Sequence, residues 1–156
     1  MNDEHYMHIA IQLAIDSVQT GKGGPFGAII VRNGLILGKG QNRVLIDKDP
    51  TAHAEVVAIR DACRQLDHFQ LEGCTIYTSC EPCPMCLGAI YWARPERIVF
   101  GCTKEDASAI AFDDAFIYEE LDKSLSDRQL PTSQILREEC LKAFRLWQNK
   151  ADRESY

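Results

Sequence analysis

The sequence predicts an α/β fold, and three observations support this. Helical patterns of apolar residues alternate with strand-like runs through the middle of the chain. Such alternation favours parallel strands joined by right-handed crossovers, with helices packed on a sheet. The length of 156 residues fits one domain. The 46% of hydrophobic residues and 26% of charged residues exclude a disordered chain, a collagen-like repeat and a coiled coil.

The first expected elements are a helix and a hairpin. Residues 3–20 repeat apolar side chains at helical spacing, and Gly21 follows as a stop signal. Within residues 25–40, two apolar runs are joined through Asn33 and Gly34. Both residue types tolerate positive φ, so this dipeptide predicts a tight hairpin turn.

The rest of the chain alternates helix and strand and then ends in a helix. Thr51 is the expected N-cap of the next helix, because its hydroxyl can accept from a free backbone N–H. The elements predicted after the hairpin are a helix over 52–66, a strand over 75–79, a helix over 82–92, a strand over 97–101 and a helix over 133–148.

Charge and composition limit the partners that we expect. The net charge is −6, and an acidic chain binds phosphate backbones poorly, so we expect no nucleic-acid partner. No apolar run approaches the roughly 18 residues of a membrane span, so we expect no membrane partner. The N-terminal residues 1–10 hold acids and no Lys or Arg, unlike a secretory signal. These features predict a cytoplasmic protein.

Four residues attract attention as candidates for chemistry, although each is ambiguous alone. Cys83 and Cys86 are spaced so that both sulfurs face one side of a helix start; alone they could form a redox pair or half of a structural zinc site. A lone histidine such as His53 is usually an ordinary surface or core residue. Glu55 stands near a helix N-terminus, where a negative charge is favourable in any case.

The combination of these residues points to a catalytic zinc site. His53, Cys83 and Cys86 supply three ligands and leave the fourth tetrahedral position open for water, which is typical of catalytic zinc. Zinc lowers the pKa of such a water towards about 7. Glu55 then stands ready to move protons without binding the metal. A nucleophilic water and a proton carrier are what a hydrolytic deamination requires.

The His-Ala-Glu and Pro-Cys-Pro-Met-Cys motifs resemble the signature of the zinc-dependent cytidine deaminase superfamily. The resemblance implies a three-layer α/β/α sandwich around a central five-stranded mixed sheet. It also implies a single deaminase domain over residues 1–156 with a bound Zn²⁺.

Within that superfamily the chain resembles the small bacterial guanine deaminases. The similar stretches are residues 24–28, 49–55, 78–95 and 112–114, together with the closing Tyr156. The resemblance implies a hydrolase of purine metabolism that converts guanine to xanthine and ammonia.

The resemblance also assigns roles to individual residues. Glu55 is expected to carry a proton from the water to N3 of guanine, and Asp114 to assist the departing amino group. An adjacent pair such as Asp113 and Asp114 can also be merely solvated. The further substrate-binding residues that the resemblance implies are Asn42, the backbone N–H of Ala54, Phe26 and Trp92. Asn42 could instead cap a turn, and the two aromatic residues could be core residues.

The C-terminal segment is expected to join two subunits. The resemblance implies a homodimer in which residues 130–156 form a helical segment swapped between subunits, so that Tyr156 reaches the neighbouring site. The simple alternative is that Tyr156 belongs to a frayed chain end.

Other functions are also compatible with parts of the pattern. A tRNA adenosine deaminase shares both motifs, but a basic face would be expected on it. A cytosine or pyrimidine-precursor deaminase fits the flanking residues less well. A non-catalytic, zinc-stabilised interaction module would need Cys80 as fourth ligand. A thiol oxidoreductase would use Cys83 and Cys86 but would leave His53 and Glu55 unexplained.

Overall fold

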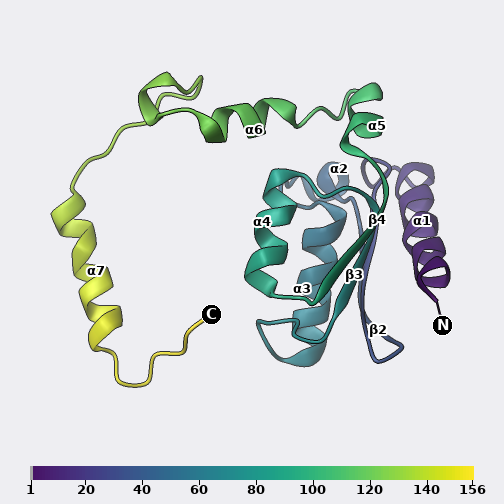
Figure 1. The fold of residues 1–156 in the computed structure, drawn as a ribbon, viewed down its shortest axis with the longest axis horizontal. Helices are drawn as coiled ribbons and strands as arrows, with labels where there is room; N and C mark the ends of the chain where they lie inside the picture. Colours follow the sequence, from purple (N-terminus) through teal and green to yellow (C-terminus); the bar gives the residue numbers. More distant parts are fainter. Residues whose placement is uncertain (1) are drawn as a thin grey trace. The chain divides into compact units, whose positions relative to one another are not determined.

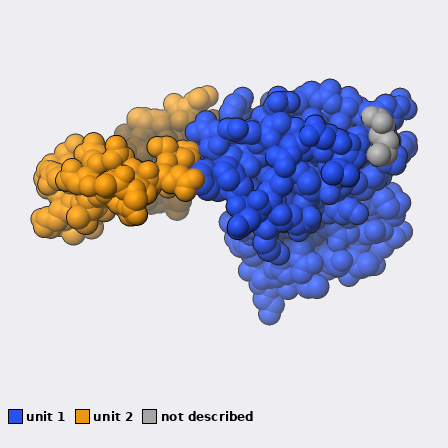
Figure 2. Space-filling view, turned by 90° about the horizontal axis from the view of Figure 1, so that it is seen from below, with its two compact units in different colours: residues 1–114 blue, residues 115–156 orange. Residues whose placement is uncertain are grey.

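The computed structural model describes residues 2–156, which form two compact units (Figure 2). Unit 1 is Met1–Asp114 and unit 2 is Ala115–Tyr156. Unit 1 holds a sheet between helices, and unit 2 holds helices only. Among the helices of residues 2–156, none has the length and apolar character needed to cross a bilayer.

The sheet of unit 1 has four strands in the order β2 (Leu35–Gln41), β1 (Gly27–Arg32), β3 (Thr75–Cys80) and β4 (Arg97–Cys102). The first three are antiparallel neighbours, whereas β3 and β4 are parallel, so the sheet is mixed. The predicted hairpin is confirmed, with Asn33 and Gly34 at φ of 52° and 80° in its turn. The predicted α/β fold is also confirmed.

The expectation of five strands is wrong for this chain. After β4, Thr103 and Asp106 form a reciprocal capping box that starts helix α5 (Lys104–Ala109). This box commits the chain to a helix where a returning strand would have to begin. Residues 104–156 then contain helical elements and loops but no strand.

Helices cover both faces of the sheet in unit 1 (Figure 1). Side chains alternate across β1, so that Ile29 and Val31 pack towards α1 (Asp3–Gln19), while Ala28 and Ile30 face the other side. That other side is covered by α3 (Ala54–Leu66) and α4 (Pro84–Ala93). A short helix, α2 (Val44–Asp47), follows β2.

The two helices that carry the candidate site both start two residues later than expected. Thr51 does not cap α3, because its backbone N–H and hydroxyl both donate to Asp49, at 2.8 and 2.7 Å. His53 is the N-cap instead. In the same way, α4 begins at Pro84 with Cys83 as its N-cap. Two predicted zinc ligands therefore stand at the starts of two helices.

Gly40 allows the start of α3 to approach the sheet closely. A Cβ on Gly40 would lie 2.0 Å from the carbonyl oxygen of Ala54, far inside any real contact. Because this position of β2 has no side chain, the N-terminal end of α3 can pack directly against the sheet.

Unit 2 contains α6 (Ala115–Asp122), a short 3₁₀ turn at Leu125–Asp127 and α7 (Arg137–Asn149). The predicted C-terminal helix is confirmed as α7, although it begins at Arg137 rather than at residue 133. Glu120 organises the middle of the unit by accepting hydrogen bonds from Lys123 and from the backbone of Gln129, at 2.6 and 2.8 Å. None of its residues is buried.

Candidate active site

The N-terminal ends of α3 and α4 bring His53, Cys83 and Cys86 together. His53 Nδ1 lies 3.5 Å from the Sγ atoms of both Cys83 and Cys86. The three candidate ligand atoms all lie within 4.8 Å of one another. The sequence prediction placed these three residues in one site, and the structure brings them together there.

The three residues fit a tetrahedral zinc ion. Zn–S bonds of about 2.3 Å and Zn–N bonds of about 2.0–2.1 Å put a nitrogen and a sulfur ligand about 3.6 Å apart. The two nitrogen–sulfur distances, both 3.5 Å, match this value. His53, Cys83 and Cys86 are thus positioned to hold zinc with one coordination position left over.

The surroundings of Cys83 favour the thiolate form that zinc binds. Hydrogen bonding from the Cys86 thiol, and then from His53 and the Cys86 backbone N–H, lowers the pKa of Cys83 to about 4 against the effect of burial. The backbone donor is one of the free N–H groups in the first turn of α4 and lies 3.5 Å from the Cys83 sulfur. Helix starts commonly lower the pKa of a thiol in this way.

Glu55 lies in the first turn of α3 and is only 6% exposed. The Thr78 hydroxyl donates to its Oε1 at 3.0 Å, and the Cys86 sulfur lies 3.4 Å from its Oε2. Burial is the main cause that raises the pKa of Glu55 above its ordinary value. A buried carboxyl beside the metal ligands is suited to take up and release a proton.

Asn42 follows β2 and is oriented by several hydrogen bonds. Its backbone N–H donates to Phe26 at 3.0 Å, and its carbonyl accepts from the Ser17 hydroxyl at 2.8 Å. The side-chain Oδ1 accepts from the Val44 N–H at 3.1 Å, which turns Nδ2 the other way. The next residue, Arg43, donates from its backbone to Ala52 at 2.9 Å and so ties this loop to the segment that carries His53.

Asp114 closes unit 1 and is half-buried. Burial is the largest cause that raises the pKa of its carboxyl, and the negative charges of Cys83 and Asp113 raise it further.

The other predicted residues are less closely tied to the metal ligands. Ala54 is fully buried at the first position of α3, where a backbone N–H has no acceptor within the helix. Phe26 is partly buried and packs edge-to-face on Phe112, with ring centroids 5.1 Å apart. Trp92 is 62% exposed near the end of α4, and Tyr156 is 67% exposed in unit 2.

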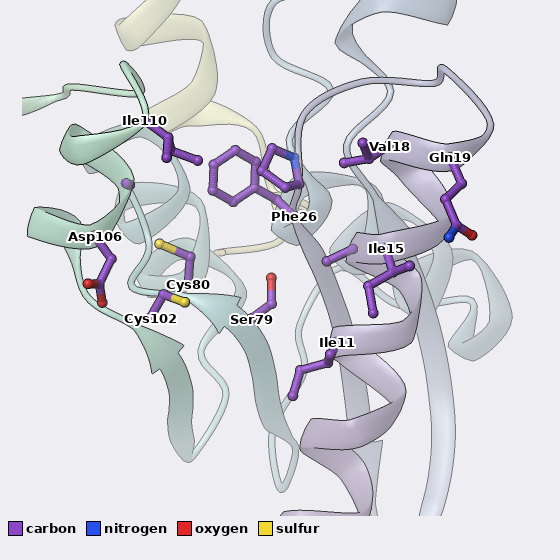
Figure 3. Close-up of a pocket in the computed structure, with 13 residues that line it drawn as sticks. Ile11, Ile15, Val18, Gln19, Phe26, Ser79, Cys80, Cys102, Asp106 and Ile110 are labelled. Atoms are coloured by element: carbon purple, nitrogen blue, oxygen red, sulfur yellow. The ribbon is translucent and has the colours of Figure 1, made fainter.

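A separate apolar pocket lies between α1 and α5 (Figure 3). Its volume is about 540 Å³, and of the predicted site residues only Phe26 lines it. Cys80 also lines this pocket, and its sulfur donates to the Thr103 carbonyl at 3.6 Å. Burial raises the pKa of Cys80 to about 12. Cys80 does not belong to the group of candidate metal ligands formed by His53, Cys83 and Cys86.

Three residues of this region had no role in the sequence prediction: Thr78, Ser17 and Gly23. Thr78 offered a signal, because it is the polar residue between Ile76 and Cys80 on the inward face of a buried strand. Ser17 and Gly23 gave no comparable signal, since each acts only through the fold around Asn42.

Comparison with known proteins agrees with this geometry. Residues 1–102 match the model of the cytidine and deoxycytidylate deaminase zinc-binding region. The chain belongs to this deaminase family. Zinc is the metal of the family, and the three residues positioned to hold it all lie inside the matched part of this deaminase.

Two relatives show how the similarity to other family members is distributed. A guanine deaminase from Bacillus subtilis is 51% identical over the full length of both chains. Its X-ray structure superposes with a TM-score of 0.97, covering 100% of this chain and 99% of that one. A tRNA-specific adenosine deaminase from Aquifex aeolicus is 44% identical over 100 residues, or 64% of this deaminase and 66% of the relative.

Proposed function

We propose that this deaminase hydrolyses guanine to xanthine and ammonia. The observation that supports this most is the similarity to the Bacillus subtilis guanine deaminase across the entire chain. That similarity includes residues 103–156, which lie outside the part matched by the general family model.

The proposed reaction uses two carboxyl groups of unit 1. Bound zinc supplies Lewis-acid activation of water at neutral pH. Glu55, buried beside Cys86, takes the proton from the attacking water and delivers it to N3 of the ring. Asp114 assists departure of the amino group from C2. Its raised pKa suits this role, because a carboxyl that protonates more easily can donate to a leaving amine.

Asn42 and the start of α3 are proposed to bind the base. With its Oδ1 held by the Val44 N–H, Asn42 presents Nδ2 as a donor to acceptor atoms on the purine edge. The Ala54 N–H offers a second donor. Phe26 and Trp92 are proposed to pack against the ring, and Tyr156 to complete the site from a neighbouring subunit.

The homodimer with a swapped segment over residues 130–156 belongs to the same proposal. Two features support it. The face of α7 that includes Cys140 and Trp147 is apolar and exposed, and the pocket between α1 and α5 in unit 1 is apolar. A helix with an unburied apolar face needs a surface to cover it. Light scattering of the purified protein measures the predicted dimer mass.

We also propose a cytoplasmic location.

The experiment that tests the activity is ammonia release by the zinc-loaded protein from a panel of bases. The panel contains guanine, adenine, cytosine, cytidine, guanosine and a tRNA with a wobble adenosine. We expect turnover of guanine but not of guanosine. Turnover of adenosine in the tRNA alone would favour the second candidate function, which the similarity to the Aquifex aeolicus enzyme supports. Release from no base would contradict both.

A further inference from the structure

The carboxylate of Glu55 is contacted by a buried hydroxyl group, that of Thr78. Thr78 lies in β3 and is 1% exposed, on the inward face of the sheet. Burying a hydroxyl among apolar groups is costly unless it makes a hydrogen bond. The Thr78 Oγ1 lies 3.0 Å from Glu55 Oε1, so the bond that satisfies the hydroxyl also restrains the carboxylate.

The two oxygens of Glu55 have different surroundings. Oε1 faces Thr78, whereas Oε2 lies 3.4 Å from the sulfur of Cys86. A cysteine that binds zinc does so as a thiolate, which has no proton to donate. Of these two side-chain contacts, only that from Thr78 therefore remains a hydrogen-bond donor to Glu55 in the zinc-bound protein.

We propose that Thr78 is a positioning residue for Glu55. Its hydroxyl anchors Oε1 and so keeps Oε2, the oxygen 3.4 Å from the Cys86 sulfur, directed towards the zinc ligands. The inference rests on the proposed role of Glu55 in deamination, but it does not depend on which base is the substrate.

The Thr78 hydroxyl has a second acceptor nearby. Thr78 Oγ1 also lies 3.0 Å from the Cys80 carbonyl oxygen, so its one proton has two acceptors within reach. A carboxylate is a stronger acceptor than a backbone carbonyl, so the hydroxyl donates to Glu55.

The test compares Thr78→Val, which keeps the shape and removes the hydroxyl, with Thr78→Ser, which keeps the hydroxyl. Loss of a hydrogen bond to a charged group should lower kcat of the Val variant about tenfold to a hundredfold. KM should stay within about threefold, because Thr78 acts through Glu55 and not on the base. The Ser variant should keep kcat within about threefold of wild type. Thr75→Val, at the start of the same strand, is the matched control.

Zinc content and crystal structures of the variants distinguish a misplaced Glu55 carboxylate from general damage to the zinc site. All variants should bind one zinc per chain. The zinc-loaded wild type and Ser variant should hold Glu55 in one conformation, and the Val variant should show a displaced carboxylate. If Thr78→Val does not fold, Thr78→Ala, which removes the hydroxyl without adding bulk, takes its place with the same expectations.

Several results would overturn the proposal: wild-type kcat in Thr78→Val, a Ser variant as slow as the Val variant, or an unmoved Glu55 in the zinc-loaded Val structure. The kinetic comparison uses whichever base the wild-type protein deaminates, so failure with guanine alone contradicts only the proposed substrate. If no base is turned over, the proposed function fails, while the position of Glu55 in the crystal structures still decides whether Thr78 anchors it.

Discussion

The two units of the molecule differ in what determines their structure. In unit 1, β1 is covered on both faces, and residues such as Ile29 and Ile30 are completely buried. In unit 2 no residue is buried, and Phe144, Leu146 and Trp147 of α7 are 69%, 74% and 44% exposed. Burial of apolar surface is the main force in folding. Unit 1 therefore buries enough apolar surface to stabilise its own fold, whereas the apolar side chains of α7 are not covered within unit 2.

The end of the family match separates features that are general to the deaminase family from features that lie beyond it. The family model ends at residue 102, so it includes the metal ligands and Glu55 but not Asp114 or Tyr156. A metal site needs ligands held at fixed distances, which a packed sheet and two helix starts provide. The similarity to the guanine deaminase of Bacillus subtilis, 51% identity over the whole chain, extends through residues 103–156. We expect changes at the metal ligands and Glu55 to abolish chemistry, and changes in residues 115–156 to alter substrate use.

The largest effect is expected from Glu55→Gln in unit 1. The amide cannot move the proton, so turnover should fall about 10²–10⁴-fold while zinc stays bound. Ammonia release and zinc content, measured on the same sample, test this. Glu105→Gln is a matched control, because Glu105 is also an acid in the first turn of a helix. Near-normal turnover by a zinc-loaded Glu55→Gln protein would exclude Glu55 as the proton carrier.

A smaller effect is expected from Gly23→Ala, which perturbs binding without touching the metal ligands. An added Cβ would lie 2.1 Å from Asn42 Oδ1 and 2.7 Å from its carbonyl oxygen, so the Asn42 amide has to move. Loss of one hydrogen bond to the base, worth about 1.5 kcal/mol, should raise KM for guanine about tenfold. Steady-state kinetics measure the effect.

Gly88→Ala provides the control for this change. A Cβ at Gly88 meets no atom within 4 Å, and alanine favours a helix interior by about 0.5–1 kcal/mol. This variant should keep the wild-type KM and melt slightly higher. If Gly23→Ala also kept the wild-type KM, Asn42 would have no part in binding the base.

Much of unit 1 could be predicted from the sequence because its signals are local. Asn33 and Gly34 both tolerate the positive φ of a tight turn, and together with the apolar runs on either side they predict the hairpin. The His-x-Glu and Cys-x-x-Cys spacings predicted the metal ligands, because side chains three residues apart at the start of a helix lie on the same side of it. The exact start of α3 could not be predicted. Asp49 accepts hydrogen bonds from the backbone N–H and the hydroxyl of Thr51, so Thr51 does not cap the helix, and apolar periodicity gives no sign of this turn.

The fifth strand was expected from resemblance and not from any run of residues. The capping box of Thr103 and Asp106 was present in the sequence and would have argued for a helix after β4. The role of Thr78 could not be predicted for a different reason. Its partner Glu55 lies 23 residues away, and only the packing of α3 on β3 brings the two together.

Deletion of Tyr156 alone tests whether unit 2 contributes a residue to an active site. If the last residue completes a neighbouring active site, kcat/KM for guanine should fall about tenfold, the cost of roughly one good contact. The melting temperature should change little, because Tyr156 adds little burial within its own chain, where its side chain is 67% exposed. Ser155→Ala is the neighbouring control. An unchanged kcat/KM in the deletion variant would remove Tyr156 from the site and leave it a chain end.

The smallest effect is expected at the start of unit 1, where Asp3 joins α1 to the sheet. Its carboxylate accepts from Arg97 at 2.6 Å and from the Tyr77 hydroxyl at 2.8 Å, and these bonds, Arg97 first, hold the pKa of Asp3 below its ordinary value of 3.8. A lowered folded pKa gives stability that is fully present above the unfolded pKa and is lost as pH falls through the folded one. Asp3→Asn should therefore melt slightly below wild type at pH 7, and the gap between the two melting temperatures should narrow as the pH falls below about 4. Glu4→Gln, at the adjacent position, is the control for removal of one charge. A gap that stayed constant from pH 7 down to the acid limit of folding would mean that the contact acts through packing and not through charge.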